Sequence, residues 1–210
     1  MKKLLFLFII FSFSDGFAQR FEIGAGRNFS IFKYEDASGN TDTNLTYRKG
    51  LFYSLGYVKQ VGSRHLISPD VYFIEAGADS KILGEPMEYR LSYVGLAVSY
   101  AYEIVDRNRY SFSSGVAAGY DHLLKGTQSV GREQYDLLKE KALKPNDLNL
   151  SLLAAGRFMI TESMFFTLEY RFRYGLTQIE NSNQGETTHI MGHLASIGLS
   201  FNLSETPKQP

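Results

Sequence analysis

The chain has 210 residues, with 22 basic and 22 acidic side chains and therefore no formal net charge. This balance argues against a nucleic-acid partner, because no basic excess is present to neutralise phosphates. The sequence contains no cysteine, which excludes disulfides, thiolate metal sites and cysteine nucleophiles. Tyr (14), Phe (16) and Gly (19) are frequent while Pro (5) is scarce, a composition that favours β structure.

The first segment has the pattern of an export signal. Lys2 and Lys3 form a short basic region, residues 4–13 are apolar, and small residues stand before a cleavage point at Ala18 or Gln19. The apolar stretch is too short for a transmembrane helix, although an uncleaved anchor is the alternative interpretation. No cysteine follows the signal, so a lipoprotein is excluded. We therefore expect export with a cleaved signal peptide.

The remainder predicts eight strands. Taken in chain order they cover residues 20–32, 51–59, 65–78, 87–104, 109–121, 148–160, 164–176 and 189–203. Short turns at 61–64, 105–108 and 161–163 alternate with longer polar connections at 33–50, 79–86, 122–147 and 177–188. Short turns at one end and long loops at the other are typical of an outer-membrane β-barrel, and an even strand number places both chain ends on the periplasmic side. The predicted domains are a signal peptide at 1–18, the barrel at 19–203 and a polar C-terminal tail at 204–210.

One loop carries a different pattern. In "GREQYDLLKEKALK", residues 131–144, Glu140 and Lys144 are four residues apart and Pro145 ends the run. This spacing is compatible with a short helix that serves as a binding element or with a solvated helical turn.

The segment "MFFTLEYRFRYG", residues 164–175, shows the alternation that decides the fold class. Its even positions are all apolar or aromatic, whereas its odd positions include Glu169, Arg171 and Arg173. Successive side chains of a strand point to opposite faces, and other predicted strands likewise separate bulky apolar residues from Gly, Ser and charged residues. The bulky face fits lipid, and the small polar face fits a narrow lumen. The sequence therefore predicts an all-β, eight-stranded antiparallel up-and-down transmembrane barrel.

An eight-stranded barrel is just wide enough for side chains to fill its interior, so charges that point inward need partners there. The predicted lumenal charge network, which we expect to be structural, consists of Glu22, Asp121, Arg157, Glu169, Arg171 and Arg173.

Three stretches resemble the small PorT-like family of outer-membrane β-barrels from Gram-negative bacteria. They are "FEIGAGRNFS" at 21–30, "LISPDVYFIEAGA" at 66–78 and "FTLEYRFRYGLTQI" at 166–179. In the fourth strand the family usually carries an Ile-Pro pair, whereas this chain has Leu91-Ser92-Tyr93. The resemblance implies an eight-stranded barrel in the outer membrane and no particular activity, although some members of the family assist protein secretion.

The sequence carries little sign of catalytic or metal chemistry. His189 and His193 share one face of a predicted strand, too far apart to chelate one ion easily. His193 and Ser196 fall on opposite faces, and no G-x-S-x-G, phosphate-binding or dinucleotide motif is present. We therefore predict no enzyme activity, no metal and no cofactor, with a lipid-modifying membrane enzyme as the remaining catalytic alternative.

The favoured function is a structural or surface-interaction role. The barrel would sit in outer-membrane lipid, and the loops at 33–50, 122–147 and 177–188 would contact an extracellular or envelope protein. The alternatives are a narrow pore, an assistant of protein secretion and a soluble lipocalin-like carrier, although this chain has no Trp for the usual lipocalin Gly-x-Trp start.

Overall fold

The computed structural model describes residues 19–41, 44–82, 85–181 and 186–203, so the predicted signal peptide and C-terminal tail lie outside the described residues. The strands are β1 (Gln19–Glu35), β2 (Thr46–Val61), β3 (His65–Ile82), β4 (Glu85–Arg107), β5 (Tyr110–Val130), β6 (Glu133–Asp136), β7 (Asn146–Met159), β8 (Met164–Gly175) and β9 (Thr187–Asn202).

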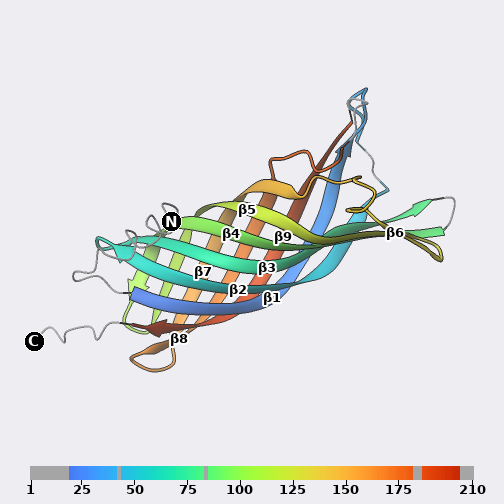
Figure 1. Ribbon diagram of the computed structural model, residues 1–210. Helices are drawn as coiled ribbons and strands as arrows, with labels where there is room; N and C mark the ends of the chain where they lie inside the picture. Colours follow the sequence, from blue (N-terminus) through green and yellow to red (C-terminus); the bar gives the residue numbers. More distant parts are fainter. Residues whose placement is uncertain (1–18, 42–43, 83–84, 182–185, 204–210) are drawn as a thin grey trace, which may run out of the picture.

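Eight long strands close into a ring (Figure 1). Each strand pairs antiparallel with its neighbour in the order β1, β2, β3, β4, β5, β7, β8, β9, and β9 pairs back to β1 from Arg20↔Asn202 to Glu35↔Thr187. The short β6 pairs with the end of β5 outside this ring. Closure leaves no open edge in the ring, which is the condition for a sheet in hydrocarbon. The predicted eight-stranded barrel is confirmed.

The outer surface of the ring is apolar. Side chains such as Leu96, Leu152, Val98 and Ile197 are between 56% and 61% exposed, which is unusual for large aliphatic residues in contact with water. Their neighbours along each strand, for example Ala97 and Leu153, are buried inside. The exposed face is therefore the lipid-facing surface of a transmembrane barrel. Within the described residues, no helix is long and apolar enough to cross a membrane.

The strands extend further than predicted at the long-loop end. The ladder between β4 and β5 continues to Met87↔Val130, β3 pairs with β4 up to Ile82↔Glu85, and β6 adds to β5 at residues 127–130. This extension is called the arm below; it comprises residues 80–82, 85–90 and 125–136, and it projects beyond the ring at the end marked by β6 (Figure 1). Much of the predicted loop 122–147 is therefore β structure.

The helix considered for residues 131–144 does not form. Residues 133–136 are strand β6, and a single turn follows at residues 137–141. The turn is held by Asp136, whose Oδ1 accepts the backbone N–H groups of Leu138 and Lys139 at 3.1 and 3.2 Å. Lys141 has a positive φ of 54°, which ends any helical continuation. Glu140 and Lys144 therefore do not form an i,i+4 pair on a helix.

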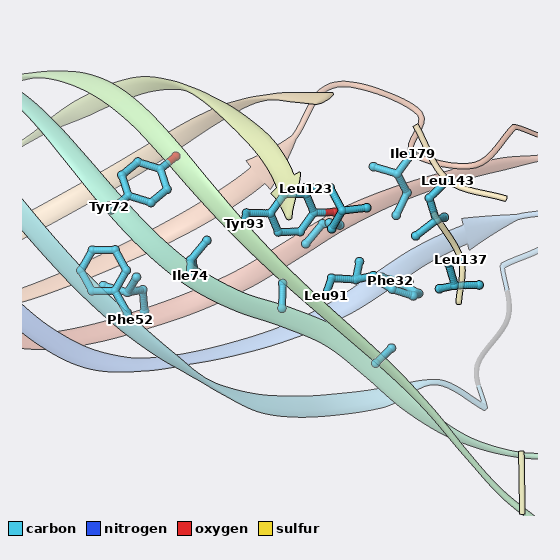
Figure 2. Close-up of a cluster of buried hydrophobic side chains, with 14 of the residues drawn as sticks. Phe32, Phe52, Tyr72, Ile74, Leu91, Tyr93, Leu123, Leu137, Leu143 and Ile179 are labelled. Carbon is cyan, nitrogen blue, oxygen red and sulfur yellow. The ribbon is translucent and has the colours of Figure 1, made fainter. Parts of the chain in front are cut away.

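The larger buried apolar cluster of the described residues lies inside the long-loop half of the barrel (Figure 2). Strand residues Ile74, Leu91, Tyr93 and Leu123 are 1–3% exposed there. Three residues from the long connections pack against them: Leu137, Leu143 and Ile179. We call this cluster the plug, because the connections bury apolar side chains in the mouth of the barrel.

Candidate functional site

The barrel interior is divided into two zones. The plug fills the long-loop half, and ionised side chains occupy the half next to the short turns. Because charges inside a barrel lose most of their water, each requires a nearby counter-charge or hydrogen bond. The candidate site is this polar zone together with the plug that covers it.

Asp121 marks the border between the zones. It is fully buried and forms an ion pair with Arg173 of β8. Tyr72 of β3 donates a hydrogen bond of 2.6 Å to Asp121 Oδ1, and the Asn149 side-chain amide approaches Asp121 Oδ2 at 3.3 Å. The Arg173 guanidinium also lies over the Tyr72 ring, 5.8 Å from its centroid. Residues from three other strands thus converge on this carboxylate of β5 and tie opposite walls of the barrel together.

Arg171 occupies the middle of the lumen between two carboxylates. Its Nη2 lies 2.9 Å from Asp70 Oδ2 on β3, and its Nε lies 2.5 Å from Glu169 Oε1 on its own strand. The side chains of all three residues are at most 14% exposed. Charge-assisted hydrogen bonds of this kind are stronger than neutral ones, so this triad clamps β3 to β8 across the barrel.

A third pair lies towards the short-turn end. Arg157 of β7 forms an ion pair with Glu103 of β4 and donates a hydrogen bond of 2.6 Å to Ser111. Nearby, Glu22 accepts a hydrogen bond of 2.8 Å from the Ser200 hydroxyl across the β1–β9 seam. The lumen is therefore cross-linked at successive levels from the turns up to the plug.

A small cavity separates these levels. It has a volume of about 70 Å³ and is lined by Glu22, Asp70, Arg157, Glu169 and Arg171 together with small residues and a few apolar side chains. Such a space accommodates a few water molecules. Asp70 Oδ1, which has no hydrogen-bond partner among the described residues, borders this space. The cavity is too small for a drug-sized ligand.

The predicted network residues all point into the lumen, but the structure distributes them over separate contacts. Arg173 meets Asp121 and Arg171 meets Glu169, whereas Arg157 and Glu22 find partners outside the predicted set. Sequence reasoning missed Asp70, Glu103, Tyr72, Asn149 and Arg20 as buried polar residues of the lumen. Only the alternation could have found them, since Asp70 and Tyr72 share a face and Glu103 continues the small-residue face of its strand.

The histidines lie on the outer surface. His193 accepts or donates a hydrogen bond of 2.6 Å with the Tyr170 hydroxyl, and His189 stacks on Tyr174 with ring centroids 5.8 Å apart. Within the described ranges, no group of three or more His, Asp or Glu residues has the geometry of a metal site. His193 is on the outer face, and the neighbouring Ser196 lines the interior cavity.

The comparisons with known proteins agree with this architecture. No protein-family model matches the chain, and no curated protein sequence matches it. Among solved structures, the outer membrane protein OprG from Pseudomonas aeruginosa has a TM-score of 0.58, with 10% identity over 90% of this chain and 98% of that chain. Neisserial surface protein A has a TM-score of 0.52, with 11% identity over 87% of this chain and 97% of that one.

The chain has the fold of the small outer-membrane β-barrels. The fold alone does not decide activity, because the outer membrane protease OmpT from Escherichia coli is also similar, with a TM-score of 0.50 and 7% identity over 91% of this chain and 99% of that one. Function must therefore be argued from the lumen, the plug and the arm.

Proposed function

We propose that the protein is a small outer-membrane β-barrel protein with a structural or surface-interaction role, exported with a cleaved signal peptide and carrying its contacts at the long-loop end. The apolar outer surface and the closed ring support a place in a lipid bilayer. Membership of the PorT-like family stays a prediction that rests on the sequence stretches alone.

The observation that carries this proposal is the filling of the lumen. Leu137, Leu143 and Ile179 are 1–6% exposed and cover the mouth of the barrel, and the clamps of Arg171 and Arg173 cross the space beneath. An ion entering from outside would meet apolar side chains before any water-filled space, and dry apolar constrictions oppose conduction. A closed lumen leaves the outer surface and the projecting segments as the places where function can reside.

Two projecting segments offer contacts. The tip of the arm, residues 131–135, is exposed, and so are residues 37–41 between β1 and β2. The second tip is built by Asp36, whose Oδ1 accepts the N–H groups of Ser38 and Asn40 at 2.9 and 2.8 Å. Of the three loops predicted to meet a partner, 122–147 and 177–188 thus each spend part of their length on the plug. We therefore propose that the two exposed tips, residues 131–135 and 37–41, carry the interaction role.

A photo-crosslinking experiment in intact cells tests the proposal. A photoreactive phenylalanine analogue replaces Tyr135, which is 38% exposed on the arm, and in a matched variant it replaces Tyr110, which is 50% exposed at the short-turn end. We expect a discrete protein adduct from position 135 that disappears when Gln134 and Glu133 are changed to Ala, with no such adduct from position 110.

Planar-bilayer recordings of the purified protein test the narrow-pore alternative by measuring ion conductance. The proposal predicts no discrete openings. Discrete openings, together with the absence of any adduct at position 135 or at a second probe replacing Ser38, would replace it with the narrow-pore alternative.

A further inference from the structure

The outer surface of the barrel carries two cations where its apolar face would otherwise continue. On β1 the outward residues Phe21, Ile23 and Ala25 lead from the short-turn end to Arg27, which is exposed. On β2 the outward residues lead in the same direction to Lys49, which is also exposed. Charged side chains on the lipid-facing surface of a barrel are destabilising unless they reach the interface or a counter-charge.

The strand register brings these two cations together. Phe29 of β1 lies directly between Lys49 of β2 and His193 of β9. Arg27 is two residues from Phe29 on the same face, between Leu51 and Ala195. Diagonal neighbours on one face of a sheet are about 7–8 Å apart, within reach of long side chains. Arg27 and Lys49 can therefore converge on one group above Phe29.

Aromatic side chains surround the same position. The His193 ring lies 5.8 Å from that of Tyr47 and 5.2 Å from that of Phe172, and its Nδ1 is 2.6 Å from the Tyr170 hydroxyl. The contact of Tyr47 with His193 spans β1, because these residues belong to β2 and β9. Tyrosine and histidine rings with a polar tip favour the level of the lipid headgroups.

Two other cations at this end of the barrel have partners on their own strands. Lys33 pairs with Glu35 at 2.8 Å, and Arg90 pairs with Glu88 at 2.6 Å. In the part of the chain that the structure describes, neither Arg27 nor Lys49 forms a salt bridge. The acid on the adjacent outer face of β3, Glu75, instead accepts the backbone N–H of Leu51 at 3.0 Å.

We propose that Arg27 and Lys49, with the rings around His193, bind the phosphorylated headgroup of a membrane lipid in the leaflet at the long-loop end. A lipid phosphate supplies the missing negative charge at the height of the two cations, and its oxygens accept hydrogen bonds from guanidinium and ammonium groups together. The acyl chains then lie along the apolar surface below. This inference rests on the proposed place of the barrel in a bilayer.

Native mass spectrometry of the barrel in a neutral detergent tests this site. The probe is bis-phosphorylated lipid A, compared with the same glycolipid after removal of both phosphates. We expect the wild-type protein to retain the phosphorylated form, and the Arg27→Gln/Lys49→Gln variant to retain at least tenfold less. The matched control, Lys33→Gln/Arg90→Gln, removes the same charge from the same end and is expected to retain lipid A as the wild type does.

Equal retention by Arg27→Gln/Lys49→Gln and the wild type overturns the site, as does equal retention of the dephosphorylated lipid by the wild type. A heat-dependent gel shift checks that each variant is folded. If the wild-type protein shows no such shift, it does not form a folded barrel in detergent, and this inference fails together with the proposed membrane placement. If the shift is present but lipid retention is equal, the binding site alone fails.

Discussion

Tyr72 and Asp121 are joined by a hydrogen bond of 2.6 Å that passes over the strand between them. Tyr72 is on β3, Asp121 is on β5, and Gly95 of β4 is the register partner of both. A Cβ atom at position 95 would overlap the Tyr72 ring and Asp121 Oδ1. The glycine is therefore required because the tyrosine must lie flat across β4 to reach the carboxylate.

Substitution Gly95→Ala is expected to destabilise the barrel. The new methyl group displaces the Tyr72 ring, which weakens the hydrogen bond to Asp121, and overpacking of this kind costs about 1–3 kcal/mol in the free energy of unfolding. The urea midpoint of the protein in lipid vesicles measures the loss. The control is Gly156→Ala, where a Cβ atom meets only the Phe158 ring at 3.5 Å and no change is expected. Equal midpoints for Gly95→Ala and the wild type would contradict this role of glycine.

Removal of the Arg171 side chain is expected to lower the free energy of unfolding more than Gly95→Ala does. Arg171→Met leaves Asp70 and Glu169 buried without their cation, and loss of one partner from a buried ion pair costs about 3–5 kcal/mol. We expect a clearly lower urea midpoint, whereas Arg109→Met in an exposed turn leaves the midpoint unchanged. An unchanged midpoint for Arg171→Met would remove the stabilising role of the lumenal charges.

The plug is expected to hold the connection that contains Leu143. Leu143→Ala removes a side chain that is 6% exposed in the plug, and such truncations cost about 2–5 kcal/mol. Because proteolysis of a docked segment follows the population of its open form, trypsin should cleave after Lys141, in the same connection, at least tenfold faster. Tyr135→Ala on the exposed arm is the control, with no expected change. Cleavage at wild-type rate in Leu143→Ala would show that the connection is not held by the plug.

The turn that positions Leu137 should depend on pH. The backbone N–H groups of Lys139 and Leu138 stabilise the carboxylate and hold the pKa of Asp136 below its ordinary value. The stabilisation is therefore present above the ordinary pKa and is lost as the pH falls through the lowered value. Amide hydrogen exchange at Lys139 should show less protection at pH 2.5 than at pH 5, relative to the intrinsic rate of each pH. In Asp136→Asn this difference should vanish; its persistence would assign the pH effect to another group.

The strands could be predicted from the sequence because a strand with lipid on one side has apolar residues on that face and small or polar residues on the other. Met164–Gly175 shows this fully, and the structure places Leu168 and Tyr170 outside and Thr167 and Arg173 inside. The inner face was harder to read in β3 and β4. There Ile74 and Tyr93 break the expected small polar lining, because the plug makes the upper lumen apolar. The irregular alternation in these two strands was thus a sign of the plug.

The pairing of the charges could not be read from the sequence. Alternation says that Arg157 and Arg171 point inward, but their partners depend on strand tilt and on which opposite wall each side chain reaches. Glu103 and Asp70 lie 54 and 101 residues away from the arginines that they contact. Likewise, the docking of Leu143 and Ile179 in the mouth depends on how two polar connections fold back. Local patterns contain no information on such contacts.

Single-cysteine labelling in intact cells tests most directly the claim that this is a closed barrel with its long-loop end outside the outer membrane. The chain has no cysteine, so Arg132→Cys on the arm and Asn108→Cys in a short turn each provide one thiol, and both positions are exposed. A membrane-impermeant maleimide is predicted to label Arg132→Cys at once and Asn108→Cys only after the outer membrane is permeabilised. Equal labelling of both positions in intact cells, or labelling of Asn108→Cys alone, would contradict the account.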